Sequence, residues 1–331
     1  MNDRLRKVLF SVTREYILSR RPVSSKRVLE VTDIKRSGAT IRNDMKKLEE
    51  MGYLYQPHTS AGRIPTDKAL RFYLDEVVEM ESEMRKESFE VDMSPSFPIG
   101  DFETLIKALA TILSRMAKGL VVMTKPKFSS LRIMDVHVTP ITKNFSVVSA
   151  VTELGLSSVV PVRMIVEEVP IFERVLKMFV GKTFEDVSKM LETIEMRDES
   201  VRNVVETLKN VLKILSIEED FVVRGISELA STLKGQEFLE VIKMVEDRKK
   251  IEEISSGVDE NMRVFIGSEN PIEGFENLAT FVAPYRKGDL KVGSVVLMTS
   301  KYVPYERIYP MVEFVSNRLT EYLTVASREV I

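Results

Sequence analysis

Residues 1–50 contain three amphipathic segments separated by polar turns. Apolar residues recur at helical spacing up to the Arg-Arg-Pro sequence at residues 20–22, where a first helix should end. Ser24 can cap a short second helix, and Ser37 can cap a third helix over residues 38–51. A helix, a short helix, a turn and a capped helix in this order indicate a helix-turn-helix.

The third helix should divide its side chains between two sides. With about 100° between successive residues, Ile41, Met45 and Leu48 form an inward apolar stripe. Asn can form two hydrogen bonds to adenine, Arg can bind guanine or phosphate, and Ala can touch a thymine methyl group. We therefore expect the outward side to enter a DNA major groove, whereas a solvated basic helix face is the alternative. The outward residues are Ala39, Arg42, Asn43, Lys46 and Lys47.

A short strand and a polar loop follow the third helix. The strand covers residues 53–55, and the loop lies between Pro57 and Pro65 with a glycine before Arg63. This pattern predicts a hairpin, or wing, that lies against the DNA backbone or in the minor groove. His58 lies among the wing residues, so we favour a phosphate contact or wing packing over a pH-sensitive switch. With the helix after Thr66, the N-terminal assignment is a winged helix-turn-helix.

The rest of the chain has a different order of elements. A linker rich in Pro and Ser begins near residue 88, and a helix covers residues 101–118. Strand patterns at residues 131–138, 145–151 and 157–165 precede a long helical stretch at 171–255. Further strand patterns and a final helix follow, at residues 263–266, 280–285, 294–299 and 305–324. This order predicts an α+β domain that is interrupted by an insertion.

An apolar stripe in the helical stretch has two interpretations. It can pack inside one chain, or it can form the seam of a homodimer, which a palindrome-reading helix-turn-helix requires. The sequence does not separate the two interpretations. The residues of the stripe are Val201, Val204, Val205, Leu208, Val211, Leu212 and Leu215.

Charge and composition agree with a DNA-binding N-terminus and exclude several protein classes. Residues 1–75 contain 16 Lys/Arg against 9 Asp/Glu, whereas the remainder contains 32 against 41, although the whole chain has a net charge of −2. The chain has no Cys and two His, which argues against disulfides, thiolate chemistry, a His-rich metal site and a Ser-His-Asp triad. We therefore expect no catalytic residues, no metal and no cofactor. No apolar run is long enough to span a membrane and no signal peptide is evident, so we expect a cytoplasmic protein without a membrane partner.

Two stretches resemble a known family. SGATIRNDMKKLEEMGYLYQPHTSAGRIPTDKALRFYLD, at residues 37–75, resembles the signature of the bacterial heat-inducible transcription repressor HrcA family, most specifically over residues 57–73. Residues 267–277 resemble the C-terminal signature of the same family. Gly38 departs from the pattern, which has Ser there, and Ala69-Leu70 replaces the usual Gly-Tyr.

The resemblance implies a repressor of chaperone operons that binds an inverted-repeat operator in double-stranded DNA as a homodimer and depends on the chaperonin. It also implies a GAF-like α+β domain interrupted by a mostly helical inserted dimerisation domain. The expected multidomain division is a winged helix-turn-helix at residues 1–90, a first GAF-like part at 91–152, the insertion at 153–254 and a second GAF-like part at 255–331.

These inferences give each candidate residue an expected role. Alternatives are a ligand-gated transcription factor that senses a small molecule through the GAF-like domain and an RNA-binding regulator. The expected base-reading residues are Ala39, Thr40, Arg42 and Asn43, and the expected backbone contacts are Ser37, Lys46, Lys47, His58, Thr59, Ser60 and Arg63.

Overall fold

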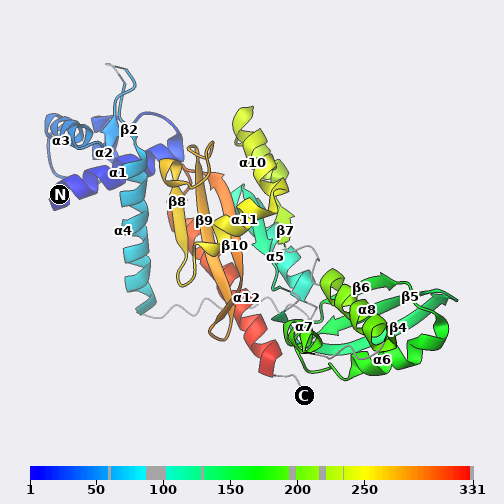
Figure 1. Cartoon of the computed structure of the whole chain (residues 1–331). Helices are drawn as coiled ribbons and strands as arrows, with labels where there is room; N and C mark the ends of the chain where they lie inside the picture. Colours follow the sequence, from blue (N-terminus) through cyan, green and yellow to red (C-terminus); the bar gives the residue numbers. More distant parts are fainter. Residues whose placement is uncertain are drawn as a thin grey trace.

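The computed structural model has an α+β fold (Figure 1). It describes residues 1–58, 61–86, 102–127, 130–193, 199–215, 221–233 and 235–328. None of the helices in these ranges is both long enough and apolar enough to cross a membrane.

The first part of the chain, residues 1–86, is called the head below. It contains α1 (Asp3–Ser19), α2 (Ser25–Val31), α3 (Gly38–Glu50), strands β1 (Leu54–Tyr55) and β2 (Ile64–Pro65), and α4 (Asp67–Lys86). The predicted caps are confirmed, because Ser24 and Ser37 accept hydrogen bonds from the N–H groups of Arg27 and Thr40. α1 ends where expected, since Arg20 adopts the left-handed conformation with φ 57°.

A five-stranded antiparallel sheet forms the centre of the molecule and, with its covering helices, is called the body. Its order is β7-β3-β10-β9-β8, so β8 is an edge strand. The strands are β3 (Leu120–Thr124), β7 (Phe221–Arg224), β8 (Arg263–Ile266), β9 (Leu278–Lys287) and β10 (Leu290–Ser300).

Helices cover both faces of this sheet because side chains alternate along each strand. Val121 and Met123 of β3 face the core shared with α5 (Phe102–Ala117) and α12 (Tyr305–Arg328). Leu120 and Val122 face the opposite core. The helices on that side are α9 (Ile226–Ala230), α10 (Gln236–Glu246) and α11 (Arg248–Ser256).

Residues 131–215 form a second unit, called the inserted unit. Its sheet has the order β4-β5-β6, with β4 (Ile133–Thr142), β5 (Phe145–Thr152) and β6 (Ser157–Val162). Its helices are α6 (Val169–Lys177), α7 (Phe184–Glu192) and α8 (Glu199–Leu215). Figure 1 shows the head and the inserted unit at opposite ends of the molecule, with the body between them.

The strand pairing corrects the expected domain division. The sequence assigned residues 91–152 to the body and 153–254 to the insertion, but β4 and β5 pair with β6 and belong to the inserted unit. Conversely, β7 pairs with β3, and α9 to α11 pack on the body sheet. Strand periodicity marks each strand, whereas its partner depends on contacts distant in the sequence.

Burial within one chain favours one of the two interpretations of the α8 stripe. Leu208 and Val211 are each 1% exposed in a single chain, so they pack internally rather than on a free face. Val205 and Leu212 are buried in the same way. The side chains of Val201, Val204 and Leu215 lie outside the described residues.

Candidate nucleic-acid interface

α3 divides its side chains as its periodicity predicts. Ile41, Met45 and Leu48 are buried in the head core together with residues of α1 and α2. On the opposite side, the candidate DNA contacts Ala39, Arg42, Asn43, Lys46 and Lys47 are all exposed. The helix therefore presents amide and cationic groups outward from an apolar anchor.

The start of α3 holds two linked hydroxyl groups. The Ser37 Oγ accepts a hydrogen bond from the Thr40 N–H at 3.2 Å and lies 2.9 Å from the Thr40 Oγ1. Because one hydroxyl donates to the other, one O–H of the pair remains for an external acceptor such as a phosphate oxygen. Ser37 thus both caps the helix and offers a polar group at its exposed end.

A partly buried ion pair that sequence reasoning missed links α3 to α1. Asp44 is 2% exposed, and its carboxylate accepts hydrogen bonds from Arg4 Nε at 2.7 Å and Nη2 at 3.0 Å. Hydrogen bonding to Asp44 raises the pKa of Arg4. The only signal in the sequence is an acidic residue beside the inward stripe, and its partner lies 40 positions earlier. This two-bond contact sets the position of the outward residues.

The other acidic residues of α3 also have cationic partners. Glu49 binds Arg63 Nη2 at 2.9 Å, and Glu50 lies 3.9 Å from Lys46 Nζ. Within the described part of the chain, Arg42 and Lys47 have no carboxylate partner. The acidic groups of α3 are therefore compensated, and its outward face stays cationic.

Arg63 has a carboxylate partner that sequence reasoning did not identify. Its side chain is 14% exposed and its guanidinium binds Glu49, so a DNA phosphate could reach it only in competition with that carboxylate. The structure instead uses Arg63 to brace the β1–β2 hairpin against the end of α3. Its expected contact with the DNA backbone stays a prediction.

The hairpin itself is held by short contacts. Gln56 Nε2 donates to the Ala61 carbonyl at 2.8 Å, and the backbones of Val23 and Arg63 exchange hydrogen bonds at 2.9 and 2.8 Å. Gly62 permits this approach, because an added Cβ would overlap the Val23 backbone. His58 is exposed near the tip, while Thr59 and Ser60 lie outside the described residues.

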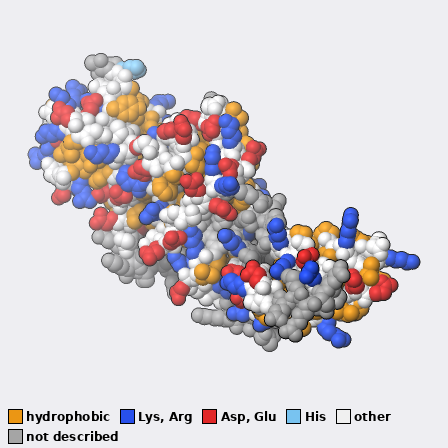
Figure 2. All heavy atoms as spheres, viewed as in Figure 1, with side chains coloured by type: hydrophobic (Ala, Val, Ile, Leu, Met, Phe, Trp, Pro, Cys, Tyr) orange, Lys and Arg blue, Asp and Glu red, His pale blue; other side chains and the backbone are white. Residues whose placement is uncertain are grey.

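The remaining candidate groups indicate no other reactive site. Figure 2 shows numerous Lys and Arg side chains over the lobe that contains α1, α2 and α3. In the inserted unit, His137 lies 2.9 Å from Asp135 and 3.4 Å from Glu173, in a hydrogen-bonded arrangement. No cluster of three or more His, Cys, Asp or Glu suited to a metal occurs among the residues that the structure describes.

Comparisons with known proteins identify the family. Residues 103–309 match the family model described as HrcA protein C terminal domain. The chain is 39% identical to the heat-inducible transcription repressor HrcA of Thermotoga neapolitana over 336 residues, covering 99% of this chain and 96% of that protein. It is also 39% identical to the protein of that name from Thermotoga maritima over 345 residues, with the same coverage.

One solved structure agrees along the whole chain. It is a crystal structure at 2.2 Å resolution of a protein described as hypothetical, with 36% identity and a TM-score of 0.73. The match covers 98% of this chain and 99% of that protein. The chain therefore belongs to the HrcA family of heat-inducible transcription repressors.

Proposed function

We propose that this chain represses chaperone genes by binding an inverted-repeat operator in double-stranded DNA as a homodimer. Membership of a family of transcription repressors, a regulatory and not an enzymatic class, supports this role. The observation that carries it is the outward face of α3, which presents Arg42, Asn43, Lys46 and Lys47. Ion pairing holds this helix in place through Asp44.

Each group on this face has a proposed contact. Asn43 and Arg42 would read base edges in the major groove, with Ala39 and Thr40 beside them. Lys46 and Lys47 would neutralise phosphates, and the Ser37–Thr40 hydroxyl pair would donate to a phosphate near the start of α3. The β1–β2 hairpin would serve as the wing of a winged helix-turn-helix, with His58 near its tip.

The homodimer would form through the inserted unit, with the body as a GAF-like domain. Large apolar side chains are exposed on this unit, including Val151 and Val159 on its sheet and Ile171 and Met178 near α6. An exposed apolar surface of this kind is typical of protein–protein contact. A twofold axis through this end would leave both heads free to reach the two halves of a palindrome.

Footprinting on the promoters of the source organism's own chaperone genes tests the proposal. We expect protection of an inverted repeat, with two half-sites whose centres are separated by about one helical turn of 10–10.5 base pairs or a multiple of it. Competition with structured RNA serves as the control, because an RNA-binding regulator would be displaced by RNA and not by the palindrome. Absence of any symmetric footprint would contradict the proposal.

Dependence on the chaperonin is a further part of the proposed function and rests on the family. A repressor whose active fraction depends on assisted folding would lose activity when unfolded proteins occupy the chaperonin. A gel-shift titration of refolded protein, with and without chaperonin, measures that active fraction. An unchanged fraction would remove this part of the proposal and leave operator binding intact.

A further inference from the structure

α4 connects the candidate DNA-binding face to the body, and its first turns are bonded on both sides. Towards α3, the Thr66 hydroxyl donates to the carbonyls of Gly52 at 2.8 Å and Tyr53 at 3.0 Å. Lys68 Nζ donates to the Met51 carbonyl at 3.0 Å. The start of α4 therefore moves together with the end of α3.

Towards the body, Asp67 makes two contacts. Its Oδ2 accepts a hydrogen bond from the Ser268 N–H at 3.0 Å, and its Oδ1 binds Lys301 Nζ at 2.7 Å. Lys301 is largely shielded from solvent, so this ion pair is less weakened than a surface pair. The first residue of α4 thus contacts two separate segments of the body, a short 3-10 helix at Gly267–Glu269 and the end of β10.

The body is shaped to receive Asp67. Gly267 has φ +57°, and a Cβ at this position would overlap the Asp67 carboxylate. A side chain here would be strained and would also displace the carboxylate. Gly267 therefore allows a close approach between the two parts of the molecule.

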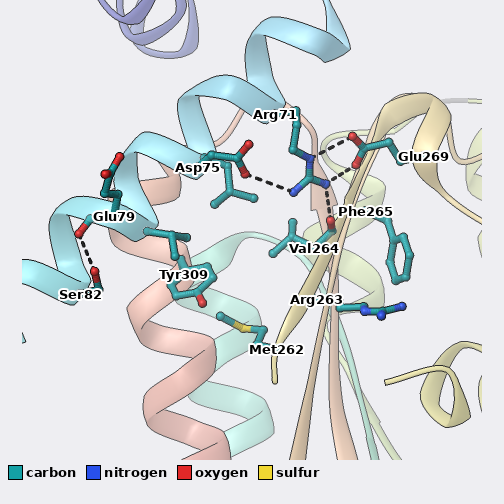
Figure 3. A pocket seen from close by; sticks show the side chains of 12 residues that line it. Arg71, Asp75, Glu79, Ser82, Met262, Arg263, Val264, Phe265, Glu269 and Tyr309 are labelled. Carbon is teal, nitrogen blue, oxygen red and sulfur yellow. Dashed lines mark hydrogen bonds and ion pairs between the residues drawn. The ribbon is translucent and has the colours of Figure 1, made fainter. Parts of the chain in front are cut away.

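One turn further along α4, Arg71 forms the second tie. Its Nε donates to Glu269 Oε1 at 2.9 Å, and its Nη2 donates to Glu269 Oε2 and to the Val264 carbonyl of β8 (Figure 3). Glu269 Oε2 also accepts a hydrogen bond from the Ile266 N–H at 3.0 Å. This forked geometry fixes direction as well as distance, because both groups are planar.

α4 and the body also border a groove, and Arg71 and Glu269 are among the residues that line it. Figure 3 shows Glu79 and Ser82 of α4 on one side and Met262 and Tyr309 of the body on the other. Leu70, Tyr73 and Leu74 add buried apolar contacts on the same helix, and Leu74 also lines the groove. Apolar contacts are non-directional, so directional contacts set the orientation of the head. Arg20, which donates to the Tyr302 carbonyl, and Tyr73, which donates to Glu306, add to the ties of Asp67 and Arg71.

We propose that Asp67 and Arg71, with Gly267, Glu269 and Lys301, form an orientation latch that sets the half-site spacing accepted by the homodimer. This inference rests on the proposed function. The latch holds the outward face of α3 at a fixed angle to the body, and the inserted unit at the other end joins two such bodies. If the connection between the two heads is rigid, the dimer fits one half-site spacing, whereas a flexible connection fits several spacings. Asp67 and Arg71 are positioning residues in this scheme and touch no DNA.

Binding to a spacing series tests the latch. Inverted repeats lengthened one base pair at a time, over about 10 base pairs, present the second half-site at every angle around the duplex. The wild-type chain should prefer its best spacing over one about 5 base pairs longer by about tenfold or more. The double variant Asp67→Asn with Arg71→Gln should reduce this ratio to within about threefold, with affinity for a single half-site unchanged.

Two further variants make the result specific. Arg318→Gln with Glu321→Gln removes one exposed ion pair of α12 and should keep the wild-type ratio. Exchanging the charges of the second tie, Arg71→Glu with Glu269→Arg, should keep more of the spacing preference than Arg71→Glu alone. An unchanged ratio in the Asp67/Arg71 double variant would overturn the proposal.

A distance measurement in the absence of DNA tests whether the latch holds the head at a fixed position on the body. Because the chain has no Cys, spin labels can be placed at two introduced thiols, Met51→Cys at the end of α3 and Leu290→Cys in the body. Labelled chains diluted with unlabelled chains report distances within one copy. We expect one narrow distance distribution with the latch intact and a broad one in the double variant. Equal widths would overturn the latch even if operator binding holds. A narrow wild-type distribution together with loss of operator binding would instead overturn the proposed function and the role in spacing, and leave the rigid junction in place.

Discussion

The outward face of α3 and the outward surface of the inserted unit are both solvent-exposed, but they carry opposite chemistry. On α3, exposed positions hold Arg42, Asn43, Lys46 and Lys47, above a buried apolar stripe. On the inserted unit, exposed positions include Val159, which pairs with Ser149 across β5 and β6 on the open side of the sheet. Cationic groups attract phosphates over a long range. Exposed valines stabilise an association only when another surface covers them and removes them from water. The difference supports the proposal that DNA binds at one end of the molecule and a second copy of the chain at the other.

Reversing charge on α3 should give the largest effect. Lys46→Glu with Lys47→Glu replaces two phosphate contacts by repulsion, so affinity for any duplex should fall by about 100-fold or more at low salt. Fluorescence anisotropy with labelled duplexes measures the loss. Lys249→Glu with Lys250→Glu, an equally exposed adjacent pair on α11, is the matched control and should retain binding. Equal losses in the two variants would mean that overall charge, and not the α3 face, controls affinity.

A single amide on the same face should separate specificity from affinity. Asn43→Ala should cost about 1–3 kcal/mol on the cognate operator and little on random DNA, because it removes base contacts. Lys46→Ala should weaken all duplexes alike and reduce the salt slope by about 1. Titrations of both DNAs over a series of salt concentrations distinguish the two patterns. A loss for Asn43→Ala that is the same on both DNAs would contradict its role as a base reader.

A charge on the inserted unit should act only on assembly. Val159 is 62% exposed, so Val159→Lys should leave the chain folded but place like charges near each other in a symmetric interface, weakening the dimer by about tenfold. Sedimentation equilibrium measures this change. Leu290→Lys, at a body position that is also 62% exposed, is the matched control. If neither substitution changes the dimer constant, the contact between copies lies elsewhere.

The smallest expected effect is on thermal stability, from a substitution of Asp75 on α4, which lies between the head and the body. Burial beside the groove raises the pKa of Asp75, and Glu269 and Glu76 raise it further, while Arg71 opposes them. A carboxyl group whose pKa is raised by folding lowers stability once pH exceeds its unfolded value. Asp75→Asn should therefore raise Tm at neutral pH by about 1 °C or less, since the side chain is solvent-screened. The gain should shrink as pH falls through the folded pKa of Asp75, and a gain that grows towards low pH would contradict the sign of the shift.

The features that sequence predicted well depend on nearby residues. Helix starts at Ser24 and Ser37 follow from side chains three residues from their backbone partners, and the inward stripe of α3 follows from helical spacing. The outward candidates on α3 could therefore be named residue by residue. The resemblance of residues 37–75 to a family signature extends over too many positions to arise by chance. This resemblance supplied the repressor function, which helical periodicity alone does not indicate.

The features that sequence missed depend on distant partners. The sequence does not distinguish Asp44 from other polar positions, because its partner Arg4 lies on another helix. The sequence likewise does not show that Arg63 forms an ion pair with Glu49. The α8 stripe has the same pattern whether it packs internally or between copies, and only burial of Leu208 decides. The four-residue strand β7 lies in a helical stretch and is defined by its pairing with β3. These outcomes are set by contacts between segments and not by local propensity.

The contact of Arg71 with β8 has a consequence for the solubility of the body. An edge strand presents unpaired backbone groups to which another chain can add a strand, and proteins protect such edges to avoid aggregation. Here Arg71 occupies the Val264 carbonyl and Glu269 occupies the Ile266 N–H. A body produced without residues 1–86 would lose the guanidinium that covers this edge. The head thus also covers part of the free edge of the central sheet.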